Sequence, residues 1–358
     1  MRLSHSMVSK YTNCAKEYEY YYVKKIRSKN KSAALLFGSA VDLAFTAILN
    51  KSNEDPITIF DKNWHFQRVG KDVSYLPTCT EIVYSKADFD KDLLSEEALF
   101  KMSETLEKEI TLDLIEKAIK QKDYVGYNFL PEDIKVIINL ASWHVLYAKG
   151  LLMIKALNED IMPNITEVLG TQVQVNLSNE EGDTIIGFVD LVARWKDLKD
   201  PVIFDLKTSS IIYEADSVKK SAQLSLYTHA LSEEFNTRTA GYLVLSKRVT
   251  KNRVKVCSKC GNDGSGGRHK TCAQTINEIR CNGEFIETIS PKCETQVIIN
   301  EIPQRTEDIV LDNYEHVNNS IKHNVFPRNL NNCHRGYGPC DYVNLCYNDS
   351  MEGLEQNE

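Results

Sequence analysis

Hydrophobic residues alternate with polar ones in the middle of the chain and recur at helical spacing on either side of it. The runs TQVQVNL, TIIGFVDLVARW and PVIFDLKTS lie between residues 171 and 209 and are separated by Asn, Gly and Asp. Alternation bounded by turn residues predicts three β-strands. A helical pattern over 217–235 and an apolar strand over 239–249 follow. The central order is therefore predicted to be β-β-β-α-β.

The flanking segments are mainly helical in pattern. Ser4 or Ser6 is expected to cap an N-terminal helix, and a second helix is expected to begin at Gly38. Further patterns predict long helices over 92–122 and 131–158, an irregular segment over 50–90, two short strands (IETIS and TQVIIN) and a helix over 303–323. Together these elements predict an α/β fold, with a mixed central β-sheet flanked by helices, a helical insertion and a small cysteine-rich insert.

Composition is that of a folded globular protein. The chain has 358 residues, 42% hydrophobic and 26% charged. Its continuous apolar runs fall far short of the ~20 residues of a membrane span, and the N-terminus lacks the apolar segment of a secretory signal. We therefore expect a cytoplasmic protein without membrane contact. The net charge of −7 excludes a uniformly basic surface, but basic runs over 24–31 and 247–270 allow local binding of nucleic acid.

Carboxylates on two neighbouring predicted strands indicate a metal-dependent site. Asp190 ends IIGFVD, and Asp205 and Lys207 stand two residues apart on IFDLK, so the latter pair leaves one face of its strand. Asp190 and Asp205 are candidate ligands of Mg²⁺ or Mn²⁺, and the backbone carbonyl of Leu206 lies between the second pair. Lys207 is a candidate to contact the attacking water or the phosphate. The triplet alone is weak evidence, because surface strands often carry such pairs.

The neighbours of these residues resemble a known family. G-F-V-D and I-F-D-L-K-T-S are followed by a predicted helix that holds Gln223 and Tyr227 in Q-L-S-L-Y. This order resembles the RecB-like branch of the PD-(D/E)XK nucleases, in which G-x-x-D and D-x-K carry the metal and catalytic groups. The resemblance implies a restriction-endonuclease-like core in which Gln223 and Tyr227 organise the site or contact DNA. Their i, i+4 spacing places both on one helical face.

The N-terminal part of the chain carries the same resemblance with one departure. LSHSMVSKYTNCAKEYEYYYV is similar to the opening of that branch, and FGSAVDLAF is similar to its G-x-x-x-H element. Asp42 stands where better-known members have His, so a carboxylate replaces an imidazole ligand, which suits Mg²⁺. Asp42 is therefore a candidate metal ligand; a helix-surface acid in a salt bridge is the alternative.

The resemblance covers residues 1–48, 165–250 and 303–347 and suggests a division of the chain. Its five segments are an N-terminal helical part of the nuclease domain (1–48), a mainly helical insertion (49–160), the nuclease core (161–256), a zinc-ribbon-like insert (257–293) and a C-terminal part with a cysteine cluster (294–358).

Eight of the ten cysteines lie after residue 256, which indicates organised sites. Cytosolic thiols stay reduced, so metal is favoured over disulfides. Cys333, Cys340 and Cys346 resemble the C-terminal triplet that, with one N-terminal cysteine, holds a [4Fe–4S] cluster in AddB-type and CRISPR-associated exonucleases of this branch. The resemblance implies Cys14 as the fourth ligand. The usual C-x2-C start is widened to six residues here, so zinc or reduced thiols without metal remain alternatives, and His334 could substitute as a ligand.

The other cysteines form a Gly-rich insert that resembles a zinc ribbon. Cys257 and Cys260 make the C-x2-C pair typical of structural Zn²⁺, and Cys272 with Cys281 is the favoured second pair. His269 or Cys293 could replace one of that second pair. A loop this short has no core of its own, so metal would supply its folding energy, and its basic surroundings suggest contact with DNA or a protein partner.

These patterns favour a metal-dependent DNA nuclease of phage type, an exonuclease or end-processing enzyme in recombination or repair in a bacterial or phage-infected cell. Its substrate would be single-stranded DNA or duplex ends. The chain lacks a G-x-x-x-x-G-K-[ST] phosphate loop, so a helicase partner would supply any unwinding; a recombinase or single-strand-binding protein is a further candidate partner. The alternatives are a catalytically silent DNA-binding or scaffold protein of the same fold and a zinc-ribbon nucleic-acid-binding factor.

Overall fold

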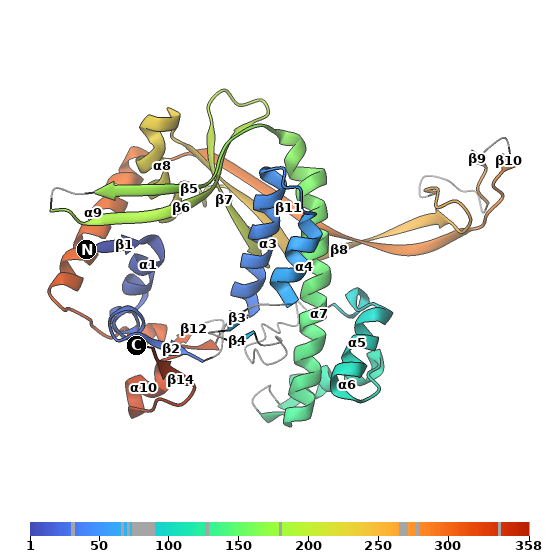
Figure 1. The fold of residues 1–358 in the computed structure, drawn as a ribbon, viewed down its shortest axis with the longest axis horizontal. Helices are drawn as coiled ribbons and strands as arrows, with labels where there is room; N and C mark the ends of the chain where they lie inside the picture. Colours follow the sequence, from blue (N-terminus) through green and yellow to red (C-terminus); the bar gives the residue numbers. More distant parts are fainter. Residues whose placement is uncertain are drawn as a thin grey trace.

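Two lobes of helices lie below one central sheet, and a long β-ribbon projects from one end of it (Figure 1). The computed structural model describes residues 1–29, 33–65, 68–69, 72–73, 90–125, 129–178, 181–264, 271–276, 279–335 and 338–357.

The central sheet has six strands and mixed direction. β6 pairs with β5 along one side and with β1 and β7 along the other; β8 follows β7 in parallel, and β11 runs antiparallel to β8. Their bounds are β1 (Arg2–Ser4), β5 (Ile165–Ser178), β6 (Thr184–Trp195), β7 (Val202–Ser209), β8 (Thr239–Cys257) and β11 (Phe285–Glu301). The parallel β7–β8 pair is joined by helix α8 (Ala222–Phe235), as a parallel connection requires a crossover.

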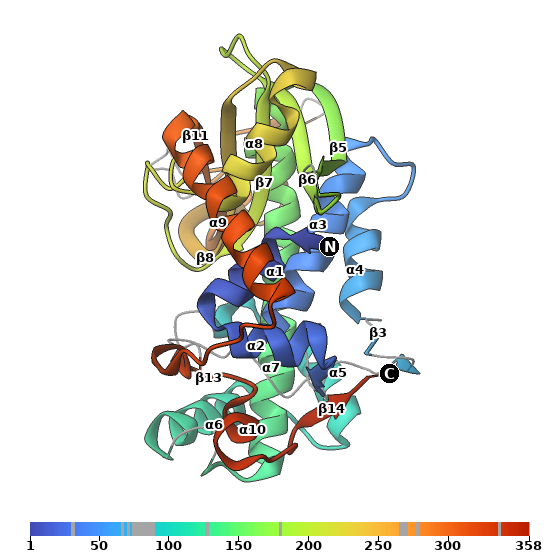
Figure 2. The same ribbon diagram turned by 90° about the vertical axis from the view of Figure 1, so that its left-hand side faces the viewer.

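Helices cover both faces of this sheet (Figure 2). Alternate residues of β7 point to opposite faces: Phe204 packs in the cluster with α3 (Ala33–Leu49) and α7 (Glu132–Ala156), whereas Ile203 packs with α8. Helix α9 (Gln304–Lys322) lies beside α8 on the latter face. The predicted α/β class with a mixed sheet between helices is confirmed.

The helical lobe and the terminal lobe flank the space below the sheet. The helical lobe consists of residues 90–125 and 129–164: η3 (Lys91–Leu93), α5 (Glu96–Leu106), α6 (Leu112–Val125), α7, η5 (Leu157–Ile161) and η6 (Met162–Asn164). The terminal lobe consists of residues 1–29 and 329–357: β1, α1 (His5–Asn13), α2 (Ala15–Tyr18), η1 (Glu19–Val23), β2 (Ile26–Ser28), η7 (Leu330–Asn332), β12 (His334–Arg335), β13 (Gly338–Pro339), α10 (Val343–Asn348) and β14 (Leu354–Gln356). Antiparallel pairing of β2 with β14 joins the two ends of the chain.

The ribbon is a continuation of β8 and β11 beyond the sheet. These strands have 19 and 17 residues and pair from Thr239 with Glu301 out to Cys257 with Phe285, with one register shift between Cys293 and Thr295. The short strands β9 (Thr275–Ile276) and β10 (Ile279–Arg280) stand at its tip.

Several boundaries differ from the sequence prediction. The helix expected to begin at Gly38 begins at Ala33, and the segment 50–90 contains helix α4 (Pro56–His65), whose Phe60 and Trp64 are fully buried. Strands β3 (Arg68–Val69) and β4 (Asp72–Val73) lie in the same segment.

The long pattern over 92–122 is two helices because Glu107 takes the left-handed conformation (φ 49°) at the end of α5. The two short strands expected near the end of the sheet are one strand, β11, since alternation continues through Pro291 with only the register shift described above.

One helical stretch is apolar and long enough to cross a membrane. It spans Glu132–Asn164, and 78% of its most apolar window is buried inside the protein. Its side chains belong to two hydrophobic clusters, one under the sheet and one within the helical lobe. This stretch is therefore accounted for as a core helix.

Candidate active site

The G-F-V-D motif lies in a gap in the pairing of β6. On the side away from β5, β1 pairs with residues 184–186 and β7 pairs with residues 191–193. Within the part of the chain that the structure describes, residues 187–190 have no strand partner on that side. Side chains from neighbouring elements can therefore meet here instead of a backbone ladder.

Asp190 and Asp205 come from the two strands that diverge at this gap. The backbone N–H of Leu206, beyond the last β6–β7 pair, donates to Asp190 Oδ2 at 2.8 Å. Asp205 Oδ2 lies 2.6 Å from Lys207 Nζ, which confirms that the D-x-K pair shares one strand face. The part assigned to the Leu206 carbonyl stays a prediction.

Helix α8 holds the lysine from the other side. Lys207 Nζ donates to Gln223 Oε1 at 3.2 Å, and Gln223 Nε2 donates to Tyr227 Oη at 3.1 Å. A Cβ atom at Gly187 would lie only 2.7 Å from Cε1 of Tyr227. The glycine of the motif is thus required by the close approach of the tyrosine ring, and the two predicted α8 residues lie at the site with Asp205 and Lys207.

Asp42 approaches the same carboxylates from α3. Gln172 Nε2 donates to Asp42 Oδ2 at 3.4 Å, whereas Asp42 Oδ1 is buried and has no hydrogen-bond partner among the described residues. Asp205 Oδ2 is also buried and lacks a hydrogen bond of good geometry, although it forms the ion pair with Lys207. Two underused buried carboxylate oxygens are what a cation would bind.

The raised pKa values of the three aspartates also indicate a cation site. Burial, followed by the charges of Asp205 and Asp42, raises the pKa of Asp190 to about 7. Burial also raises the pKa of Asp205, against the opposing charge of Lys207, and burial followed by the Asp205 charge raises that of Asp42. Three carboxylates therefore share one lysine, and the ionised cluster needs further positive charge.

The donor set fits a hard divalent cation. Carboxylate oxygens suit Mg²⁺ and Mn²⁺, and Mg²⁺ keeps several of its waters when it binds protein carboxylates. That property matters here, because the three aspartates do not form a group whose ligand atoms all lie within 4.8 Å; among the described residues only the four cysteines of the insert do. Asp42, Asp190 and Asp205 would hold the ion, in part through water.

His5 and Tyr314 were not predicted from the sequence. His5, the first residue of α1, follows the three-residue strand β1, and its Nδ1 lies 3.0 Å from Oη of the buried Tyr314 on α9. Burial and then the charge of Lys207 lower the pKa of His5 to about 4, so its ring is neutral at neutral pH. A strand of three residues has no detectable alternation, which is why its neighbourhood was missed.

A family model agrees with this geometry. The model described as PD-(D/E)XK nuclease superfamily matches residues 2–347. The chain belongs to this superfamily. No curated protein matches the chain. Membership establishes the general class, a metal-dependent nuclease, and accounts for the acidic site at the gap in β6.

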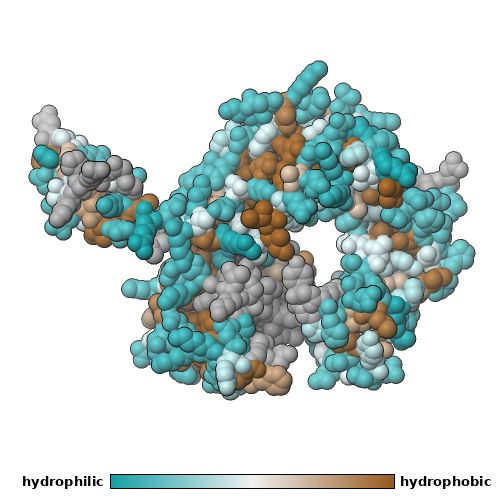
Figure 3. All heavy atoms as spheres, turned by 180° about the vertical axis from the view of Figure 1, so that it is seen from behind, coloured by the Kyte–Doolittle hydropathy of each residue, from teal (hydrophilic) through white to brown (hydrophobic). Residues whose placement is uncertain are grey.

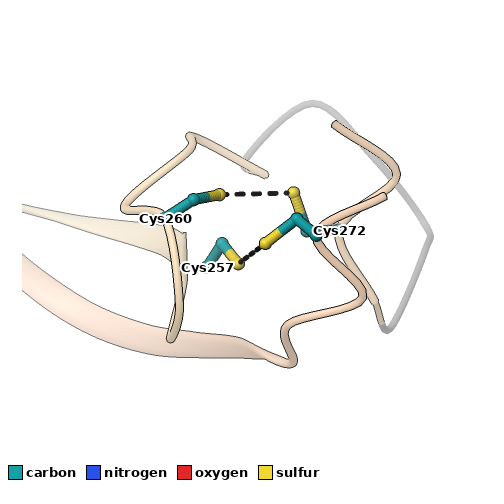
Figure 4. A group of neighbouring side chains, drawn as sticks. Cys257, Cys260 and Cys272 are labelled. Carbon is teal, nitrogen blue, oxygen red and sulfur yellow. Dashed lines mark hydrogen bonds between the residues drawn. The ribbon is translucent and has the colours of Figure 1, made fainter. Parts of the chain in front are cut away.

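The superfamily core of this chain carries a separate group of four cysteines at the tip of the ribbon (Figure 4). Their sulfur atoms all lie within 4.8 Å of one another, with Cys257 and Cys281 3.5 Å apart and Cys260 and Cys272 3.7 Å apart. Tetrahedral zinc with Zn–S bonds of about 2.3 Å separates its sulfurs by about 3.8 Å. A Cβ at Gly283 would lie 2.4 Å from the Cys257 sulfur, so this glycine makes room for the group.

These four are the residues predicted from their spacing, and they could bind a metal. Cys293 is not among them: it is buried at the base of the ribbon, where its thiol donates to the Ser246 carbonyl at 3.3 Å and burial raises its pKa to about 12. His269, the other alternative ligand, lies outside the described residues.

The nuclease fold also brings both ends of the chain to one small cavity. Cys14, Cys333, Cys340 and Cys346 all line it. Backbone N–H of Asn329 donates to the Cys14 sulfur at 3.4 Å, and Nε of Arg328 donates to the Cys346 sulfur at 3.3 Å. The four cysteines thus line one cavity, but among the described residues their sulfur atoms do not form a group within 4.8 Å of one another.

Proposed function

We propose that this protein is a Mg²⁺- or Mn²⁺-dependent deoxyribonuclease of the RecB-like branch that processes DNA ends. The observation that carries the proposal is the convergence of Asp190, Asp205 and Lys207 at the gap in β6, with underused carboxylate oxygens beside them. Mg²⁺ or Mn²⁺, when bound, would neutralise phosphate charge and lower the pKa of an attacking water.

The chain's own residues would divide the remaining work. Lys207, held by Gln223 and by Asp205, would place its ammonium against the developing charge on the phosphate. Tyr227 would fix Gln223, since the two are hydrogen bonded. Neutral His5 would add a hydrogen-bonding group near the phosphate without competing with the metal for the aspartates.

The shape of the molecule supports an end-directed substrate path. Asp42 lies on α3 and His5 on α1, and in Figure 1 these helices stand on opposite sides of the space between the two lobes. Figure 3 shows the molecule hollowed beneath the sheet, with an opening between the lobes. A DNA strand that enters this opening by its end would reach the acidic site.

The test is hydrolysis of end-labelled DNA with Mg²⁺, Mn²⁺ or EDTA. Wild type should shorten linear single strands or duplexes only with metal, and covalently closed circles should resist it. Asp205→Asn and Lys207→Met should each lower the rate on the order of 100-fold or more, because each removes charge at the reacting phosphate. Asp216→Asn, an exposed aspartate outside the site, is the matched control.

Three results would contradict this proposal. Intact substrates under every metal condition would remove the enzymatic function and leave a DNA-binding or scaffold protein. Equal rates for wild type and Asp205→Asn would remove the assigned site. Degradation of closed circles at the same rate as linear DNA would replace the end-directed activity with an endonuclease.

We further propose a [4Fe–4S] cluster at the terminal cavity and Zn²⁺ at the ribbon tip as structural cofactors. Ligands from residues 14 and 333–346 would fasten the two ends of the terminal lobe together. Protein purified without oxygen should absorb near ~400 nm and contain iron and sulfide, and Cys340→Ala should lose both. Two zinc ions and no iron would place zinc at both sites.

A helicase, recombinase or single-strand-binding protein is the proposed kind of partner, since the nuclease needs single strands or ends that another protein supplies. Co-purification from cells that contain its DNA substrate, with and without nuclease digestion of that DNA, tests for a direct contact.

A further inference from the structure

The ribbon described above forms an arm that leaves the body of the protein. We define the arm as residues 248–293, of which 248–264, 271–276 and 279–293 are described. Figure 1 shows it extending away from the sheet and both lobes. From Arg248 to Val256 the residues of β8 are exposed or half-buried, whereas β8 within the sheet is almost entirely buried. The arm thus offers surface on both faces without a hydrophobic core of its own.

The arm is a positively charged segment of an acidic protein. Residues 248–293 contain nine Lys and Arg and four Asp and Glu, whereas the whole chain has a net charge of −7. The seven of these cations that the structure describes are all exposed: Arg248, Lys251, Arg253, Lys255, Lys259, Arg280 and Lys292. The side chain of Arg253 is 82% exposed and meets Glu287 only at 3.9 Å, in an exposed ion pair of little strength.

Strand geometry places three cations in a row. Lys251, Arg253 and Lys255 stand two residues apart on β8, so they share one face of the ribbon at intervals of about 6.8 Å. Lys251, the residue nearest the body, forms ion pairs with Asp90 and Asp92 of the helical lobe. The base of the arm is thereby fastened to the body, while Arg253 and Lys255 beyond it are exposed.

We propose that the arm binds the phosphate backbone of duplex DNA. A two-stranded antiparallel ribbon has the dimensions to enter or follow the major groove, and cations on alternate residues can meet successive phosphates of one strand. Zinc held by four thiolates carries a formal charge of −2, so the cations of β8, rather than the tip, would make the phosphate contacts; the metal would stiffen the tip.

This inference rests on the proposed nuclease function and defines its substrate as DNA with a duplex segment next to the processed end. Val244 of β8 pairs with Lys207 of β7, and Arg253 lies nine residues further along β8. The distance along β8 from Val244 to Arg253 is at most about 30 Å, which corresponds to roughly nine base pairs at 3.4 Å each. Duplexes that extend well beyond this length should gain affinity from the arm.

The experiment measures DNA binding by fluorescence anisotropy in EDTA, where the proposed hydrolysis is off. The arm variant is Arg253→Ala, Lys255→Ala and Lys259→Ala in the full chain. The control variant, Lys101→Ala, Lys117→Ala and Lys155→Ala, removes equal charge from exposed positions of the helical lobe. Zinc content and thermal unfolding confirm that both variants keep the metal and the fold.

We expect the arm variant to bind a ~25-base-pair duplex on the order of 10- to 100-fold more weakly than wild type at 0.1 M salt, with a shallower dependence of log K on log salt by about 2–3. The control variant should bind like wild type, and a six-base-pair duplex or a single strand should not distinguish the arm variant from wild type.

Equal binding of the long duplex by the arm variant and wild type at every salt concentration would overturn the inference, and the arm would then be a surface for a protein partner. An equal loss of affinity for single strands would overturn its duplex preference. These outcomes are separable from failure of the nuclease proposal. If wild type binds duplex DNA through the arm but never hydrolyses it, only the proposed enzymatic function is contradicted.

Discussion

Substitution of Gly187 tests how closely the motif is packed against helix α8. In Gly187→Ala the new Cβ would lie 2.7 Å from Cε1 and 3.3 Å from Oη of Tyr227. Gly187 does not have a positive φ, so alanine strains no backbone and the whole cost comes from moving the ring. The ring is only 5% exposed within the cluster under α8. Overpacking of about 1–3 kcal/mol and loss of the Gln223 hydrogen bond, about 1 kcal/mol, together predict about 2–4 kcal/mol of destabilisation.

The assay is chemical denaturation of a double-mutant cycle. In a Tyr227→Ala background the space is open, so Gly187→Ala should cost less than about 0.5 kcal/mol, and the difference is the coupling energy between the two residues. Tyr227→Phe serves as the control, because it keeps the ring and removes only the hydroxyl; there the steric part of the cost of Gly187→Ala, about 1–3 kcal/mol, should persist. An undiminished cost in the Tyr227→Ala background would refute the steric reasoning and assign the effect to the backbone.

Three further predictions concern the acidic site, the arm and the support of α8. Because the pKa of Asp190 is raised to about 7, above its unfolded value, the metal-free protein should lose stability as pH rises from about 4 to about 7. Mg²⁺ should bind more tightly over the same range, because it displaces the proton. Denaturation and calorimetry at stepped pH measure these two dependences, and Asp190→Asn should flatten both. Cys260→Ser should remove zinc and expose residues 257–293 to protease, while hydrolysis of single-stranded DNA is kept; metal analysis and limited proteolysis measure the first two effects. Proteolysis at the wild-type rate would mean that the tip keeps its shape without metal. Tyr242→Phe should cost about 1 kcal/mol in denaturation, because it removes the buried 2.6 Å hydrogen bond to Ser221, the N-cap of α8, and an unchanged midpoint would show that the cap is sufficient alone.

Local spacing predicted the parts of the site that lie on single elements. Two-residue spacing placed Asp205 and Lys207 on one strand face, and four-residue spacing placed Gln223 and Tyr227 on one helical face, as the contacts between Lys207, Gln223 and Tyr227 bear out. The C-x2-C pair of the insert likewise has a local geometry that zinc sites reuse. Such patterns depend only on the direction in which side chains point from a strand, a helix or a C-x2-C turn.

The remaining features depend on how strands pair over long distances. The bond from Leu206 N–H to Asp190 exists because β7 leaves β6 after three pairs, and no local pattern encodes where a pairing window ends. Cys293 was a candidate zinc ligand by spacing alone, but its place opposite Val249 in the ribbon register separates it from the tip. His5 reaches the site only because β1 pairs with a strand some 180 residues later.

The pairing of the chain's first residues with much later ones has a consequence for biosynthesis. β1 needs β6, Lys16 N–H binds the Pro327 carbonyl, and β2 needs β14. On the ribosome, residues 1–29 emerge well before these partners, so this aromatic-rich segment stays uncovered while the residues between them are translated. The terminal lobe closes only when residues 327–356 have emerged, so a nascent chain that already contains Asp190, Asp205 and Lys207 still lacks this lobe.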